Sequence, residues 1–198
     1  MKRVLFSVLS LALLAWTAAP VSATKLQHRN IDHMSKLADR VFVGICTTAG
    51  PDEAPLAEGV TMKSTRYTFD VIESIKGNLG ATLEIRHLGN TEGVGVVPGM
   101  PVYRPGGKYV IFLLPDSDIG LCSPVGLFQG AFEVGGDPAG APESATVLNA
   151  NNNVGVFYNM ERRIDVTPLS PKQVSMVRQT RGAYDYRSFV NYVRELVN

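Results

Sequence analysis

Apolar and polar residues alternate along several short segments of the chain. The alternation over residues 67–71 and 82–88 is typical of strands with one buried face, and the apolar run at 109–114 indicates a central strand. Glycine and proline gather between the strands, so residues 49–59 and 89–107 are predicted to be loops. We expect further short strands at residues 41–46, 123–127, 129–134, 146–148 and 154–158.

A second pattern, in which apolar residues recur every three or four positions, predicts helices towards the two ends of the chain. The first covers residues 24–40, where Asn30 or Asp32 can cap its start. Ser170-Pro171 supplies the N-cap and first-turn residues that open a second helix. A last helix is expected after Gly182, with an apolar stripe along one side.

Many short strands separated by glycine and proline turns favour a mainly-β fold, either a closed barrel or a sandwich, over a parallel α/β sheet. Residues 24–160 hold all of the expected strands and are predicted to form one β-barrel domain. Residues 161–198 form a helical segment that we expect to pack on or beside the barrel. The alternative for the last helix is that it docks a partner protein.

The N-terminus has the parts of a cleavable export signal. Two basic residues, Lys2 and Arg3, precede an apolar stretch at 4–15 that is shorter than the roughly 20 residues a membrane-spanning helix needs. A helix-breaking proline and small residues follow, as a signal peptidase requires. We therefore predict a bacterial Sec-type signal peptide at 1–23 that is removed after Ala23, and a periplasmic or secreted protein. The alternatives are a eukaryotic export signal and an N-terminal anchor that is never cut.

The composition and charge of the chain limit the classes of partner that it can bind. The chain has 19 Lys and Arg residues against 18 Asp and Glu residues, and losing Lys2 and Arg3 with the signal keeps it close to neutral. Both signs are interspersed, which provides no basic patch for nucleic acid or an acidic membrane surface. We expect a protein partner in the envelope or outside the cell, no nucleic acid, and no membrane contact after signal cleavage. About 175 residues then remain, enough for one domain with a real core.

Two cysteines, Cys46 and Cys122, make up the whole cysteine content. In an exported chain an even pair usually forms a disulfide, which we predict here, with two separate buried thiols as the alternative. The bridge would close a long loop and stabilise the fold by about 4 kcal/mol in the chain-entropy model. A redox role is not indicated, because the sequence has no Cys-x-x-Cys motif.

Six segments of the chain together resemble known families: 38–44, 67–71, Lys76-Gly77, Gly99-Met100-Pro101, 106–113 and 125–132. One family is a group of uncharacterised exported bacterial proteins, and a more distant one is the netrin-like domain of the tissue inhibitors of metalloproteinases, a five-stranded OB-type barrel. The similarity covers roughly residues 37–134 and implies a small OB-like closed barrel with a short N-terminal helix and C-terminal helices.

The chain departs from those inhibitors at its start. They chelate the zinc of the protease through a mature N-terminal cysteine, whereas this chain is expected to begin at Thr24, with a helix before its first strand. The resemblance therefore does not imply protease inhibition through an N-terminal cysteine, because a fold can be shared without the function.

The sequence contains no strong motif for catalysis or metal binding. The three histidines, His28, His33 and His87, lack the spacing of a zinc site, and we expect the first two to be solvated and His87 to lie on the surface or rim. Cys122 as a nucleophile would need a base, for which His87 is the one histidine we can name. Asp116 and Asp118 alone supply too few oxygen ligands for a calcium ion. We predict no catalytic, cofactor-binding or metal-binding residue.

The long loops are the best candidates for contact. OB-type barrels bind along one sheet face and its flanking loops, and Tyr103 and Arg104 lie in such a loop. Both residues also suit a plain turn. The function we predict is an exported, non-enzymatic binding or regulatory module. The alternatives are a hydrolytic enzyme with an unrecognised site, or a structural component of a surface assembly that docks through its C-terminal helix.

Overall fold

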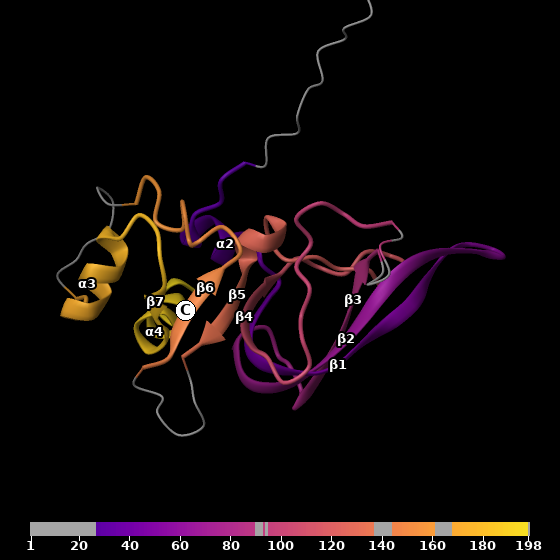
Figure 1. Cartoon of the computed structure of the whole chain (residues 1–198), viewed down its shortest axis with the longest axis horizontal. Helices are drawn as coiled ribbons and strands as arrows, with labels where there is room; N and C mark the ends of the chain where they lie inside the picture. The colour runs from indigo at the N-terminus through magenta and orange to yellow at the C-terminus, as the bar shows by residue number, and fades with distance from the viewer. Residues whose placement is uncertain (1–26, 90–92, 94, 137–143, 161–167, 198) are drawn as a thin grey trace, which may run out of the picture.

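A computed structural model of the chain describes residues 27–89, 93, 95–136, 144–160 and 168–197 (Figure 1). The predicted signal peptide lies outside these residues, and so does the start of the predicted C-terminal segment. The described part holds one antiparallel sheet in the order β3-β2-β1-β4-β5-β6-β7, which confirms the mainly-β prediction. Its strands are β1 Arg40–Ala57, β2 Val60–Lys76, β3 Thr82–Leu88, β4 Lys108–Leu113, β5 Ala131–Gly135, β6 Thr146–Asn149 and β7 Tyr184–Asp185.

The sheet is open, so the prediction of a closed barrel is not supported. Its two edges are β3 and β7. Residues 121–125 cross the gap between β3 and β4: the N–H of Val125 donates to the carbonyl of Phe112, and the N–H of Cys122 donates to that of Arg86. These contacts narrow the opening, but they form no strand ladder, and a barrel requires a continuous ladder between its first and last strands.

Strands β1 and β2 continue beyond the rest of the sheet as a two-stranded ribbon (Figure 1). The prediction of a loop at 49–59 is wrong, because β1 pairs with β2 up to Ala57. Pro51 and Pro55 suggested a loop, but they lie four residues apart on the edge of the ribbon, opposite Thr65 and Thr61. Proline is tolerated on an edge strand where its nitrogen points away from the partner.

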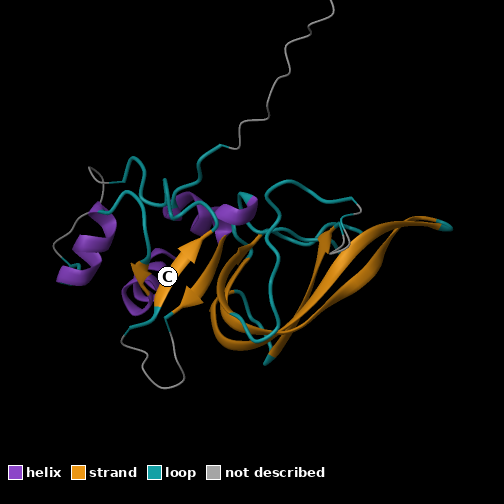
Figure 2. Ribbon diagram, viewed as in Figure 1, coloured by secondary structure: helices purple, strands orange, loops and turns teal. Residues whose placement is uncertain are grey.

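One face of the sheet carries a large core that the helices cover. Its strand residues alternate with those of the opposite face, as a pleated strand requires. Helix α2 (Ile31–Leu37) and helix α4 (Tyr186–Val197) contribute Met34, Phe189 and Val193 to this core, which is completely shielded from solvent at these positions. Figure 2 shows the helices gathered around the short strands, away from the ribbon.

The apolar stripe of α4 is therefore a packing surface. Arg194 on the same helix forms an ion pair with Glu73 on β2, with N–O distances of 2.5 and 2.8 Å, and this pair helps to hold the helix against the sheet. Helix α3 (Pro171–Arg178) begins with a capping box in which Ser170 and Gln173 bond reciprocally. Within the described part of the chain, no helix is long and apolar enough to cross a membrane.

Two predicted strands are absent. Residues 123–127 form a turn, with a single bridge at Pro124, that leads into the 3₁₀-helix η1 (Leu127–Gly130). Residues 154–158 are turns. The first helix is also shorter than predicted, because Asn30 caps it and Ala38 already has an extended backbone. Short apolar runs are compatible with strands, but these segments lack a neighbouring strand that could complete a ladder.

The other face of the sheet carries a second core around the curved strands β1 to β4. Its members include Phe42, Phe69 and Ile111, all fully buried. Residues 95–107, which precede β4, cross this core and cover it; we call this segment the covering loop. Two backbone hydrogen bonds fix the end of that loop to β1: the N–H of Gly106 donates to the carbonyl of Cys46 at 2.7 Å, and the N–H of Cys46 donates to that of Gly107 at 2.9 Å.

Candidate functional site

Tyr103, one of the two predicted contact residues, is a core residue. Its side chain is 1% exposed and enters the second core from the covering loop. The rings of Tyr67, Phe69 and Tyr109 surround it edge to face, with centroid distances of 5.0, 5.2 and 5.0 Å. Tyr103 therefore anchors the loop, and little of it is available to a partner.

Arg104, the second predicted contact residue, has an exposed side chain. Its backbone N–H donates to the hydroxyl of Tyr109 at 3.0 Å, which ties the loop to β4. The two neighbours thus have different positions: Tyr103 points inwards and Arg104 outwards.

His87 lies beside Tyr103, and its predicted position on the surface or rim is wrong. The ring is 1% exposed and has the rings of Tyr67 and Tyr103 at centroid distances of 5.5 Å each. Its Nδ1 lies 2.9 Å from the carbonyl oxygen of Cys122. A carbonyl accepts but does not donate, so Nδ1 carries the proton and Nε2 is an acceptor.

His87 and Tyr103 each carry one buried polar atom that needs a hydrogen-bond partner. Within the part of the chain that the structure describes, neither His87 Nε2 nor the Tyr103 hydroxyl has a hydrogen-bond partner. Burial lowers the pKa of His87 to about 4, although the hydrogen bond to Cys122 acts in the opposite direction. The imidazole is therefore neutral at pH 7, and the second core holds no charge at this point.

Cys46 and Cys122 are free thiols in the structure, so the predicted disulfide is not formed there. Both are buried and belong to the second core. Burial raises the pKa of Cys46, and it raises the pKa of Cys122 to about 11. Since the thiolate is the nucleophilic form, neither side chain is suited to attack a substrate at neutral pH.

Burial of both thiols leads to a prediction about alkylation. In the purified protein, Cys46 and Cys122 should resist iodoacetamide under native conditions and should both react in denaturant without reductant. Intact-mass measurement of the two samples checks this. If both stay unlabelled in denaturant until a reductant is added, the two cysteines are bridged and are not free thiols.

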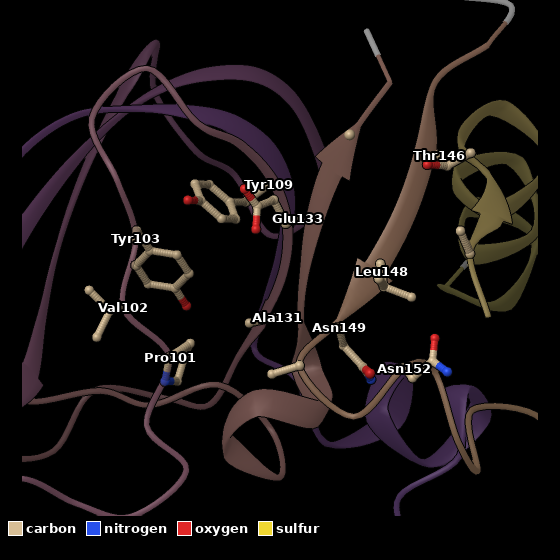
Figure 3. Close-up of a pocket in the computed structure, with 13 residues that line it drawn as sticks. Pro101, Val102, Tyr103, Tyr109, Ala131, Glu133, Thr146, Leu148, Asn149 and Asn152 are labelled. Atoms are coloured by element: carbon tan, nitrogen blue, oxygen red, sulfur yellow. The ribbon is translucent and has the colours of Figure 1, made fainter. Parts of the chain in front are cut away.

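A groove of about 650 Å³ lies on the same sheet face as the second core, but over strands β5 and β6 (Figure 3). Its floor is formed by residues of β4, β5 and β6. One wall is the covering loop, and the other is formed by Ala183 and the turn after β6. The lining residues are Pro101, Val102, Tyr103, Tyr109, Ala131, Glu133, Gly135, Thr146, Leu148, Asn149, Ala150, Asn152 and Ala183.

The groove exists because the cover of this sheet face ends early. Alternation sends Phe132, Val134 and Val147 into the helix-covered core, so Glu133 and Leu148 must point to the other side. In the part of the covering loop that the structure describes, Pro101, Val102 and Tyr103 lie on the side of Tyr109 and Ala131, opposite Leu148 of β6 (Figure 3). An apolar strip of sheet is left accessible, with Leu148 39% exposed and Val102 on the wall 65% exposed.

Three side chains form a row across the groove floor. The register pairs Tyr109 of β4 with Glu133 of β5, and Glu133 with Leu148 of β6. Figure 3 shows Glu133 beside the ring of Tyr109. Burial raises the pKa of Tyr109, and the neighbouring Glu133 carboxylate raises it further, so this tyrosine is neutral.

A separate charged cluster lies at the base of the ribbon. The Asp52 carboxylate accepts hydrogen bonds from Arg66 at 3.1 Å and from Arg86 at 2.5 Å. Burial alone would raise the pKa of Asp52, but these two guanidinium groups outweigh it and lower the pKa to about 2. The Glu84 carboxylate on β3 pairs with Arg66 as well, at 3.3 Å. Two carboxylates therefore face two guanidinium groups, so the cluster fixes the ribbon to β3 and has no net charge.

The described residues contain no group of three or more His, Cys, Asp or Glu side chains that could hold a metal ion. The groove residues Glu133, Thr146 and Leu148 were not identified from the sequence, although two of the expected strands contain them. Glu133 stands between buried Phe132 and Val134, which is a visible signal of a side chain that leaves the core.

Comparison with known proteins adds no relative. No protein-family model matches the chain, and no curated protein matches it significantly. The resemblance to exported bacterial proteins and to netrin-like domains therefore stays a prediction from the sequence.

Proposed function

We propose that this protein is an exported, non-enzymatic binding or regulatory module that holds a segment of a partner protein in the groove over β4, β5 and β6. In this proposal the chain acts in the periplasm or outside the cell after cleavage behind Ala23. The observation that carries the proposal is the uncovered apolar strip of sheet, bounded by two walls. Exposed apolar surface of this kind is typical of an interaction site.

The size and lining of the groove support binding. Ligand sites are commonly concave spaces of about 300–1,000 Å³ with an apolar lining and a few polar groups that orient the ligand. The groove has this volume, at about 650 Å³. Its apolar contacts come from Val102, Ala131 and Leu148, and its polar ones from Glu133 and Asn152.

The two alternative functions receive less support. Hydrolysis by a nucleophile and a base needs the two side chains within hydrogen-bond reach of each other. Among the described residues that line the groove, neither the Thr146 hydroxyl nor the Tyr109 hydroxyl forms a hydrogen bond with the Glu133 carboxylate. Docking through the last helix would use an exposed apolar stripe. Phe189, Val190 and Val193 of that stripe are instead buried against the sheet.

Peptide selection on the purified protein tests the proposal. Phage-displayed random peptides are selected on the wild type, and the Kd of each selected peptide is then measured for two variants. Leu148→Trp fills the groove and should weaken binding at least about tenfold, a loss typical of a residue at the centre of an interface.

The matched control is Ile72→Trp. Ile72 is 52% exposed on β2 and does not line the groove, so this variant should bind the selected peptides as the wild type does. Thermal unfolding of both variants checks that they are folded. If selection yields no binder, or if Leu148→Trp binds as tightly as the wild type, the groove is not the binding site and the proposal falls.

A further inference from the structure

We infer that the segment held in the groove is basic, with a lysine or arginine that pairs with the Glu133 carboxylate between apolar neighbours. The inference rests on the proposed binding function and adds the chemistry of the occupant.

Glu133 is the one acidic or basic residue among the described residues that line the groove, and its side chain is exposed. It lies in the middle strand of the floor, with Tyr109 on one side and Leu148 on the other in the same cross-strand row. Neighbouring strands are about 4.8 Å apart, so an occupant that contacts the apolar parts of this row must also cover the carboxylate.

Covering the carboxylate decides which occupant is favoured. A wholly apolar segment would remove water from Glu133 without replacing its hydrogen bonds, and such burial of an unpaired charge is costly. An acidic segment would add repulsion between like charges. A basic side chain restores the hydrogen bonds and the opposite charge, and its apolar stem can lie along the floor.

The apolar neighbours of the carboxylate define the rest of the occupant. Leu148 beside Glu133 and Val102 on the wall are both partly exposed, and each offers contact to an aliphatic or aromatic side chain. The preferred segment therefore has a cationic residue flanked by apolar ones. Charge complementarity at Glu133 sets the sign of the charge, and the apolar strip provides the contact area.

Three synthetic peptides test the inference. They share the sequence glycine, leucine, variable residue, leucine, glycine, carry the same fluorescent label, and have lysine, glutamine or glutamate at the variable position. Fluorescence polarisation measures their Kd for the wild type, Glu133→Gln, Glu58→Gln and Leu148→Trp. Glu58 lies exposed in the turn of the ribbon, so its substitution matches the change in net charge away from the groove.

The wild type and Glu58→Gln should bind the lysine peptide about fivefold more tightly than the glutamine peptide, and the glutamate peptide most weakly, as expected for a partly exposed ion pair. Glu133→Gln should bind the lysine and glutamine peptides equally. Equal binding of all three peptides by the wild type, together with weaker binding by Leu148→Trp, overturns the inference and leaves the proposed function standing. Binding that Leu148→Trp does not weaken overturns both.

Discussion

Replacing Tyr103 by alanine is expected to lower the free energy of unfolding by about 3–5 kcal/mol, the usual cost of removing a large buried ring. The ring touches Tyr67, Phe69 and Tyr109 in the second core, and its loss would leave a cavity that these rigid neighbours cannot close. The covering loop would also lose its anchor. Urea unfolding followed by circular dichroism measures the change.

Two phenylalanine variants separate the contribution of the tyrosine ring to stability from that of the hydroxyl. Tyr103→Phe should leave stability unchanged or raise it by up to about 1 kcal/mol, because the hydroxyl has no hydrogen-bond partner among the described residues. Tyr109→Phe should lower stability by about 1 kcal/mol, because its hydroxyl accepts from the N–H of Arg104. A loss of more than 1 kcal/mol in Tyr103→Phe would mean that this hydroxyl is hydrogen-bonded in solution.

Lowering the pH from 6.5 to 4 is expected to reduce the free energy of unfolding by about 3 kcal/mol through His87. Burial lowers the pKa of this histidine from 6.5 to about 4 in the folded protein. Below pH 6.5 the unfolded chain therefore binds a proton that the folded chain does not, and stability falls as the pH falls. The loss is complete near pH 4, below which both states are protonated.

Urea unfolding at several pH values measures this slope, and His87→Phe is the control that should flatten it. The groups that face the ring, Tyr67, Tyr103 and the carbonyl of Cys122, do not titrate in this range. Asp52 has a lowered pKa of about 2, so its contribution is lost below pH 4 and outside the window. An equal slope in the wild type and in His87→Phe would show that His87 is protonated in the folded protein.

The strands with strong local signals were predictable, and the shape of the sheet was not. Residues 82–88 alternate cleanly and form β3 with those bounds. The ribbon was mistaken for a loop because Pro51 and Pro55 indicate a loop when only their own segment is considered. Both prolines fit in a strand because β1 pairs with β2, and that pairing cannot be read from the segment alone. The open sheet follows from pairings between distant segments, which periodicity does not specify.

The candidate site was harder to predict for the same reason. The alternation around Glu133 indicates a side chain that leaves one core, but it does not indicate whether another layer covers it. That depends on how far the loop before β4 extends across the sheet. Tyr103 was chosen as a contact because it lies in this loop, and an aromatic residue in a loop serves equally well as an anchor. His87 likewise became buried through neighbours that are remote in sequence.

Strand β1 has its two neighbours at very different distances along the chain. β2 follows it after a two-residue turn, whereas β4 begins some fifty residues after β1 ends. The β1-β2-β3 meander can therefore form early from local contacts, but Val41, Phe42 and Val43 then lie on an unpaired edge until β4 arrives. Such an edge is prone to pair with other chains. We expect the arrival of residues 108–113 to be the slow step of folding, and the period before it to be the time of greatest aggregation risk.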